Sequence, residues 1–236
     1  MDYAPYIQRL AEQNPRQVLL LDANVILQDF IGSNHRTDGA KGITDPEWFR
    51  EHEASVWDAT QAYLHILRSV PNISPTDATF DEAYGILQRI APLVSRDTRE
   101  GLYSFLEELG TRRSIYSLFL EGFQKRHTAG LQLRTLEKQQ TDSRKLMSPT
   151  DADLVVAAYY FACKHRWDHH QNSVAIVSHD HDVARGSRIF MENREKFAER
   201  YPNAFGDPQG ITQPVKVYRR ILAPTAAPAE ASRALA

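Results

Sequence analysis

Two short apolar runs, each followed closely by carboxylates, constrain the fold of this 236-residue chain more than any other feature. The run at 17–22 ends on Asp22, and the run at 173–178 (SVAIVS) is followed by Asp180 and Asp182. Runs this short and this continuously apolar are typical of strands buried on both faces of a parallel sheet. Segments with helical patterns separate them, which predicts an α/β fold.

Further strands and helices can be assigned along the chain. PVKVYRRI (214–221) predicts a third strand, and PNIS (71–74) is a short fourth candidate. The stretch at 32–48 is rich in Gly and Asp and predicts a loop. Helices are expected at 4–14, 46–69, 75–94, 97–109 (ending before Gly110), 111–145 (with a break near Ala129-Gly130), 149–166 and 188–200.

The length suits one large domain with added helices. We expect a single domain over residues 1–222, with a short central parallel sheet between helical layers in an α/β/α sandwich. The segment at about 95–147 has no strand signal and indicates a helical insertion. Residues 223–236, APTAAPAEASRALA, predict a disordered tail.

Composition excludes several classes of protein. Hydrophobic residues make up 42% and charged residues 25%, the balance of a soluble globular protein. No apolar run approaches the roughly 18 residues of a membrane span, and the acidic, amphipathic N-terminus is not a signal peptide. The single cysteine, Cys163, excludes an internal disulfide, so we expect a cytoplasmic protein. Because the net charge is −2, a nucleic acid would have to bind a local basic patch.

The positions of the carboxylates predict a metal site. The carboxyl ends of parallel strands lie at one edge of a sheet, where we expect Asp22, Asp180 and Asp182 to converge. Two helix starts add further acids: SPTDAD (148–153) and SPTD (74–77), the second opening the helix with Asp81 and Glu82.

Such a cluster needs a compensating cation. Two like charges about 4 Å apart repel by roughly 4 kcal/mol at an effective dielectric near 20. Carboxylate oxygens are the ligands that Mg²⁺ or Mn²⁺ prefers, and either ion supports phosphodiester hydrolysis by activating a water. Each acid alone also fits a turn or a cap: Asp151 forms a capping box with Ser148, and Asp153 suits the positive helix end.

The order of these motifs resembles that of PIN-domain nucleases. The matching segments are LLLDAN (19–24), ATFDEAYGIL (78–87), DADLVVAAYY (151–160) and VAIVSHDHDV (174–183), and PVKVY (214–218) is similar to the last short strand of the family. The separations of Asp22, Glu82 and Asp153 along the chain are longer than in compact toxin-type members. The chain therefore resembles an elaborated member with extra helices.

The resemblance implies a PIN-like sandwich and a Mg²⁺- or Mn²⁺-dependent endoribonuclease with RNA as its substrate. It implies roles for particular residues: catalytic Asp22, Glu82, Asp153 and Asp180; metal ligands Asp22, Asp153, Asp180 and Asp182; and supporting Asn24 and Ser178, with Asp81 as the competitor of Glu82 and Asp151 as the alternative to Asp153.

A basic segment offers substrate contacts. Residues 111–145 carry eight Lys or Arg against three acids, a local charge of +5. Such a patch beside a metal centre would bind phosphates, although an ordinary solvated helix pair explains it equally well. The candidate substrate-binding residues are Arg112, Arg113, Lys125, Arg126 and, near the second acidic motif, His179.

Other functions remain as alternatives. One is a catalytically silent PIN-like scaffold that binds RNA or a protein. Another is a haloacid-dehalogenase-like phosphatase with Asp22 as nucleophile, although Asn24 stands where that family has a second Asp. A zinc site formed by Cys163, His165, His169 and His170 matches no standard ligand spacing. The sequence leaves open whether cleavage is endo- or exonucleolytic, whether the chain forms a homo-oligomer, and whether an inhibitory protein partner exists.

Overall fold

A computed structural model describes residues 3–31, 46–121, 123–141, 146–164, 174–206 and 214–219. The expected tail at 223–236 and nearly all of the expected loop at 32–48 lie outside the described residues. The same holds for His165, His169 and His170, so the structure does not test the zinc alternative.

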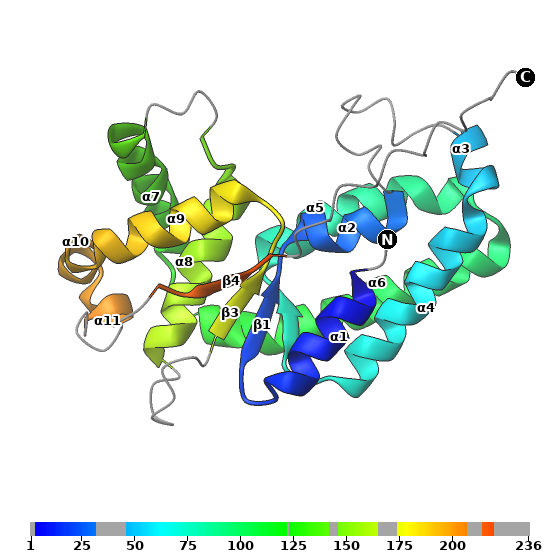
Figure 1. Cartoon of the computed structure of the whole chain (residues 1–236), viewed down its shortest axis with the longest axis horizontal. Helices are drawn as coiled ribbons and strands as arrows, with labels where there is room; N and C mark the ends of the chain where they lie inside the picture. Colours follow the sequence, from blue (N-terminus) through cyan, green and yellow to red (C-terminus); the bar gives the residue numbers. More distant parts are fainter. Residues whose placement is uncertain are drawn as a thin grey trace, which may run out of the picture.

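A short, fully parallel sheet lies at the centre of the molecule (Figure 1). The three expected strands are confirmed, and the short candidate near residue 73 is the fourth strand. The α/β class is therefore confirmed. The strands are β1 Val18–Leu21, β2 Ile73–Pro75, β3 Val174–Val177 and β4 Lys216–Tyr218, in the spatial order β2-β1-β3-β4.

The sheet separates two apolar cores. Leu19 and Leu21 of β1 point into one core, and Leu20 points into the other. On β3, Val177 joins the first core and Ile176 the second. This alternation follows from the strand period of two, and it explains why both central strands are continuously apolar.

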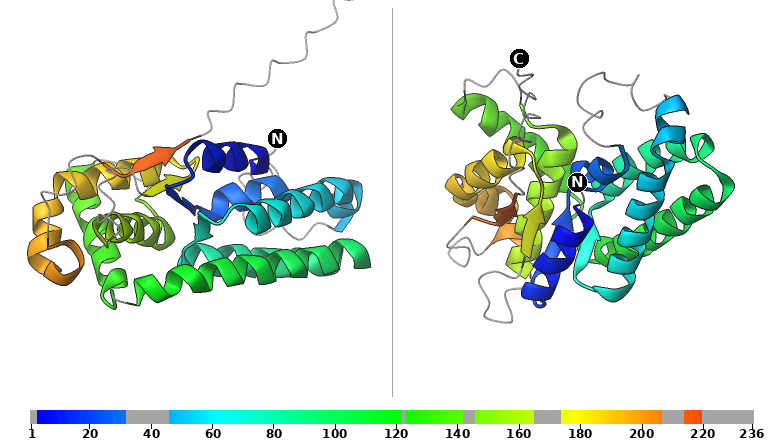
Figure 2. Two further views of the ribbon diagram at one scale, coloured as in Figure 1. Left: turned by 90° about the horizontal axis from the view of Figure 1, so that it is seen from below. Right: turned by 45° about the vertical axis from the view of Figure 1, so that its right-hand side comes forward.

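Helices cover both faces of the sheet, as two views of the ribbon show (Figure 2). The first core is closed mainly by α1 Ala4–Gln13, α2 Ala23–Ile31, α3 Pro46–Glu51, α4 Glu53–Ser69, α5 Asp77–Ile90, the 3₁₀ turn Ala91–Leu93 and α6 Arg96–Leu120. The second is closed mainly by α7 Arg126–Gln140, α8 Pro149–Lys164, α9 His181–Glu192, α10 Arg194–Arg200 and α11 Pro202–Phe205.

The structure corrects the expected ends of α6 and α7. Helix α6 runs through Gly110, where we expected it to stop, because Leu106 and Leu109 bury a continuous stripe in the first core. Helix α7 likewise runs through Gly130, whose missing side chain lets α8 approach: an added Cβ would lie 3.7 Å from the Cβ of Ala152. Burial therefore outweighs the helix propensity of glycine, which is about 1 kcal/mol poorer than that of alanine. The segment at about 95–147, expected as an insertion, contributes these two helices to the two cores and has no strand among its described residues.

The starts of two other helices also differ from the expectation. We assigned no helix directly after Asp22, but α2 begins at the next residue, and the backbone oxygen of Asp22 accepts from the N–H of Val25 at 3.1 Å. Helix α9 begins at His181 rather than at 188, because the side chain of Asp180 caps it by accepting from the N–H of Asp182. Among the described residues, no helix is both long and apolar enough to cross a membrane.

Candidate functional site

Asp22 lies at the carboxyl end of β1, with its side chain 1% exposed. Its N–H donates to the oxygen of Val177 at 3.0 Å, which ties the end of β1 to β3. Its carboxylate accepts from the hydroxyl of Ser178 at 2.6 Å and from the N–H of Asn24 at 3.2 Å. These contacts hold the carboxylate rigidly at the edge of the sheet, and through the Asn24 N–H it also caps the first turn of α2.

The environment of Asp22 favours its protonated form. Burial, the negative charge of Asp151 and, more weakly, that of Glu82 raise its pKa to about 7, although the hydrogen bonds from Ser178 and Asn24 act in the opposite direction. If Asp22 served only as a hydrogen-bonding residue at the end of the strand, the charges of Asp151 and Glu82 would not be needed close to it. The carboxylate of Asp22 is therefore set to bind either a proton or a cation near neutral pH.

Glu82 and Asp151 bring the second and third acids to this place. Glu82 comes from α5, and burial together with the charge of Asp151 raises its pKa, against a hydrogen bond from Thr150. Asp151 lies in the first turn of α8, where it forms the expected capping box: its N–H donates to Ser148 Oγ, and its Oδ2 accepts from the Ser148 N–H, both at 3.0 Å.

Asp151 is the group that links the acids electrostatically. Burial raises its pKa most, its hydrogen bonds with Ser148 lower it, and the charges of Asp180 and Asp182 raise it further. The charge of Asp151 in turn raises the pKa of Asp22 and of Glu82. The structure thus brings together Asp22 at the end of β1, Asp180 after β3, Glu82 of α5 and Asp151 of α8. Asp151 is the neighbour that the other three share.

The acids after β3 are joined to Asp22 by a chain of hydrogen bonds. The N–H of Asp180 donates to Ser178 Oγ at 2.9 Å, and the same hydroxyl donates to Asp22. Asp182 is 8% exposed and pairs with Arg185 at 2.8 Å. Arg185 also pairs with the fully buried Glu137 of α7. Ser178 therefore connects the ends of β1 and β3, and Asp182 is held in an ion pair with Arg185.

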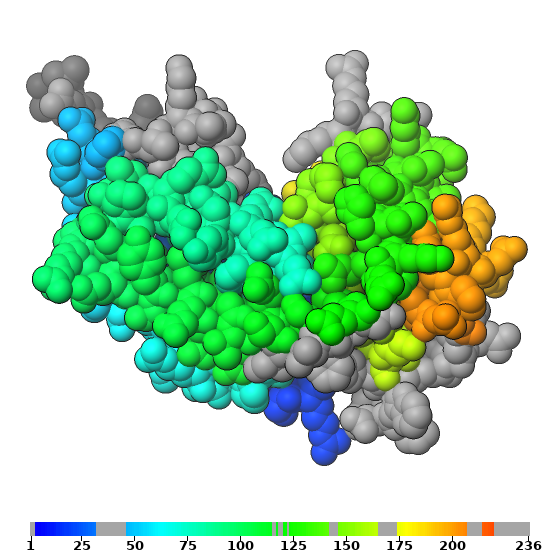
Figure 3. Space-filling view, turned by 180° about the vertical axis from the view of Figure 1, so that it is seen from behind, coloured from blue at the N-terminus to red at the C-terminus, as the bar shows by residue number. Residues whose placement is uncertain are grey.

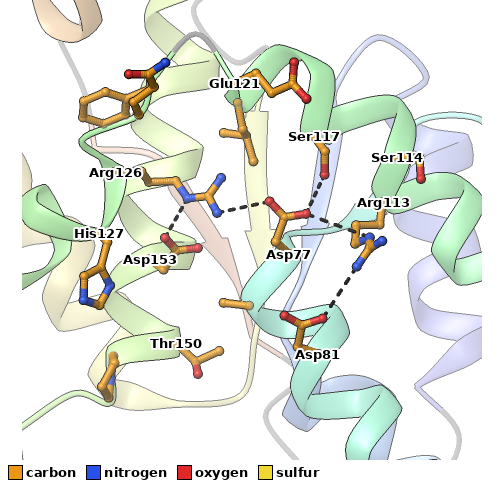
Figure 4. A pocket seen from close by; sticks show the side chains of 15 residues that line it. Asp77, Asp81, Arg113, Ser114, Ser117, Glu121, Arg126, His127, Thr150 and Asp153 are labelled. Carbon is orange, nitrogen blue, oxygen red and sulfur yellow. Dashed lines mark hydrogen bonds and ion pairs between the residues drawn. The ribbon is translucent and has the colours of Figure 1, made fainter.

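The structure does not bring Asp153 to this group. Its carboxylate pairs with the Nε of Arg126 at 2.7 Å, and the neighbouring charges are those of Arg126, Asp77 and His127 (Figure 4). Successive residues of a helix point in different directions, so Asp151 and Asp153 lie on different sides of α8. Of the two acids left open at this position, Asp151 therefore joins Asp22.

The choice between Asp81 and Glu82 is resolved in the same way. Asp81 is exposed, and it pairs with Arg113 of α6 at 3.6 Å (Figure 4). The charge of Glu82, by contrast, raises the pKa of Asp22. Glu82 is therefore the acid of α5 that lies in the candidate site.

Most of the expected substrate-binding arginines are already engaged. Arg112 donates to the backbone oxygens of Leu67 and Pro71, at the end of α4. Arg113 lies over the ring of Phe80 and faces Asp77 and Asp81; Arg126 bridges Asp77 and Asp153. Lys125 is exposed, and the ring of His179 lies against that of Tyr3 at 5.9 Å.

These ion pairs line a groove of about 920 Å³ between α5, α6, α7 and α8. The space-filling view shows the face on which these helices meet (Figure 3). Thr150 lines the groove and also hydrogen-bonds Glu82, so the groove adjoins the acidic group. The acidic side chains that line it, Asp77, Asp81, Glu121 and Asp153, outnumber the two arginines, Arg113 and Arg126, and this balance does not suit a phosphate.

The chemistry of the donors suits a hard divalent cation. Asp22, Glu82 and Asp151 offer carboxylate oxygens only, and the hydroxyl of Ser178 holds the first of them in place. Within the described ranges, no group of three or more His, Cys, Asp or Glu side chains lies close enough together to hold a metal. Mg²⁺ needs only one or two carboxylates, since waters and substrate phosphate complete its shell, so these residues fit such an ion.

Two residues near the site were missed by the sequence analysis. Thr150 contacts Glu82, and Arg219 follows β4, where its guanidinium contacts His181. A signal for Arg219 was present: it is the first residue after the strand KVY, at the same sheet edge as Asp22.

The chain matches no known protein family, no protein of curated function and no solved structure.

Proposed function

We propose that this protein is a Mg²⁺- or Mn²⁺-dependent nuclease of the PIN type that hydrolyses phosphodiester bonds, and that it acts as an endoribonuclease on RNA. The observation that carries the proposal is the buried Asp22 carboxylate, whose pKa of about 7 reflects burial and the charges of Asp151 and Glu82 at the carboxyl edge of a parallel sheet. The order of the acidic motifs, the two-faced sheet and the flanking helices all support it.

The roles of the residues follow from their positions. Asp22 and Asp151 would hold the cation, which when bound would activate a water and offset the charge of the phosphate. Ser178 orients Asp22 through its hydroxyl. Glu82, whose pKa is raised by burial and by Asp151, would accept a proton from the attacking water. Asp151 replaces Asp153 among the proposed catalytic residues. Asp180 would add its negative charge beside Asp151, and its backbone N–H would help to hold Ser178.

Cleavage of total RNA in Mn²⁺ buffer, followed by mapping of the product ends, tests the proposal. Asp22→Asn should abolish cleavage and leave the circular dichroism spectrum unchanged, because it removes the charge and preserves the shape. Asp97→Asn is the matched control, since Asp97 is exposed in the first turn of α6 and lies outside the site. Cleavage by Asp22→Asn at the native rate would refute a role for this carboxylate.

One observation favours a second function, a silent scaffold that binds RNA or a protein. The described residues contain no preformed group of three metal-binding side chains, and Asp22 also caps α2. Titration calorimetry with Mn²⁺ distinguishes the two: the nuclease requires binding that is lost in Asp22→Asn, whereas the scaffold requires none.

A further inference from the structure

A negatively charged substrate needs a positive side chain near the candidate site, in addition to any metal ion that offsets the charge of the acids. A phosphodiester that approaches Asp22, Glu82 and Asp151 meets an edge with several negative charges. Long-range repulsion of this kind slows association unless a positive side chain lies nearby. The basic side chains around this edge therefore decide how a phosphate can approach.

Most arginines around the site are already paired with carboxylates. Arg185 pairs with Asp182 and Glu137. Arg126 pairs with Asp153 and Asp77, and Arg113 faces Asp77 and Asp81. An arginine that is already paired with a carboxylate contributes little attraction to a phosphate, because its charge is cancelled locally.

Arg219 differs from these arginines in its partners. Its Nη2 donates to the Nε2 of His181 at 2.8 Å and to the backbone oxygen of His179 at 3.4 Å. Neither of these partners is a carboxylate. Its Nε donates to no acceptor, and Arg219 forms no ion pair with any described carboxylate. The charge of the guanidinium is thus not offset by an ion pair with a described carboxylate. Because its Nε is buried, only the Nη atoms can meet a phosphate.

The sheet places Arg219 beside the acids. The ends of β1, β3 and β4 lie side by side because the three strands are parallel, and the Ser178 N–H donates to the Tyr218 oxygen at 3.1 Å. Figure 1 shows β4 next to β3 and under α9, the helix that carries His181. Two strand spacings separate β1 from β4, about 10 Å. The guanidinium reaches back over the end of β3, where it contacts His179 and His181 and none of the acids of the site. An anion bound there therefore lies beside the acids.

We infer that Arg219 binds a second phosphate of the substrate, next to the one that is cleaved, so that the substrate strand crosses the sheet edge from β1 towards β4. The inference rests on the proposed nuclease function and narrows its substrate to a polynucleotide strand, as opposed to an isolated phosphodiester. His181 and the backbone oxygen of His179 hold the guanidinium in place for that contact.

Arg219→Gln tests the inference with two substrates. On an RNA oligonucleotide, KM should rise about tenfold, the loss expected for one charge-assisted contact, while kcat stays near the native value. The slope of log(kcat/KM) against log[salt] should become shallower by about one unit. With bis(4-nitrophenyl) phosphate, which has no second phosphate, the kinetics should stay unchanged. Arg188→Gln is the matched control, because Arg188 is exposed on α9 and pairs with Glu192 at 3.8 Å.

The outcomes separate this inference from the proposed function. An equal loss on both substrates would show that Arg219 only supports the fold and would overturn the inference, as would an unchanged salt slope. If the native protein cleaves neither substrate, the nuclease proposal fails. Binding of fluorescent RNA then decides the phosphate site by itself: weaker, less salt-dependent binding by Arg219→Gln than by Arg188→Gln supports it, and equal or absent binding overturns it.

Discussion

At the end of β1, the Asp22 carboxylate accepts two hydrogen bonds and is buried beside Asp151 and Glu82. The hydrogen bonds favour the charged form, but burial and the neighbouring charges together outweigh them. The residue therefore lowers the stability of the metal-free protein at neutral pH. Strain of this kind is common where a side chain serves a reaction rather than the fold.

The pH dependence of stability provides a test at this residue. Because folding raises the pKa of Asp22 from 3.8 to about 7, its contribution is full below pH 4 and is lost as the pH rises through 7. A pKa shift of about three units corresponds to about 4 kcal/mol in the free energy of unfolding. This is an upper bound for the stability that Asp22→Asn gains, because the amide nitrogen of Asn cannot accept a hydrogen bond. In metal-free urea titrations, Asp22→Asn should be more stable than the native protein at pH 8. The gap should close towards pH 4; a gap that does not vary with pH would contradict the raised pKa.

The different surroundings of Asp151 and Asp153 make a second prediction. Asp151→Asn removes the charge that links the acidic group and should lower the cleavage rate by about 100-fold. Asp153→Asn leaves that group intact and should retain most of the rate. It weakens the ion pair with Arg126, so the free energy of unfolding should fall by about 1–3 kcal/mol. Rates and urea midpoints measured on both variants check this, and the reverse order of rates would restore Asp153 to the catalytic group.

Besides α6 and α7, two further described helices carry glycines in their interiors without breaking. Helix α5 contains Gly85, and α9 contains Gly186. An added Cβ at Gly85 would meet nothing within 4 Å, whereas at Gly186 it would lie 2.5 Å from the Cε of buried Met147. The first glycine is a weak point of its helix, whereas the second leaves room for the end of the Met147 side chain.

These surroundings predict opposite effects of the same substitution. Gly85→Ala should raise the free energy of unfolding by about 0.5–1 kcal/mol, because alanine loses less backbone entropy in a helix. Gly186→Ala should lower it by about 1–3 kcal/mol, because Met147 must move within a filled core. Urea denaturation of the two variants measures both changes. A loss of stability for Gly85→Ala would show that α5 is packed more tightly at this residue than the structure has it.

For the whole molecule, the two cores meet at a four-stranded sheet whose carboxyl edge carries the candidate site. The acids come from both halves: Glu82 from α5 on one face, Asp151 from α8 on the other, and Asp22 from between them. A cation bound by these residues would join the two layers. It would therefore stabilise the folded chain as a whole.

Thermal unfolding with and without Mn²⁺ tests this coupling. At pH 8 and a concentration of 100 times Kd, bound ion should stabilise the native protein by about 2.7 kcal/mol, or about 5–10 °C in Tm for a chain of this size. Asp22→Asn should show almost no shift, and Asp97→Asn should behave like the native protein. A shift of equal size in Asp22→Asn would place the ion elsewhere.

The sequence by itself determined the strands and most of the helices. The runs VLLL and VAIV are apolar at every position because both faces of these strands are buried, and this local pattern is visible without a structure. The ends of helices were less predictable. Helix α6 passes Gly110 and α7 passes Gly130 because contacts with distant residues outweigh the local preference of glycine.

Which acids meet was decided by the tertiary structure alone. Asp151 and Asp153 stand two residues apart, and both fit a motif of acids at a helix start. Only the packing of α8 against α5 and α7 turns the first towards Asp22 and Glu82 and the second towards Arg126. The same holds for Arg219, whose place beside the acids depends on the order β1-β3-β4. A sequence specifies which charges exist, but the distances between them, and so their interactions, depend on how the elements pack.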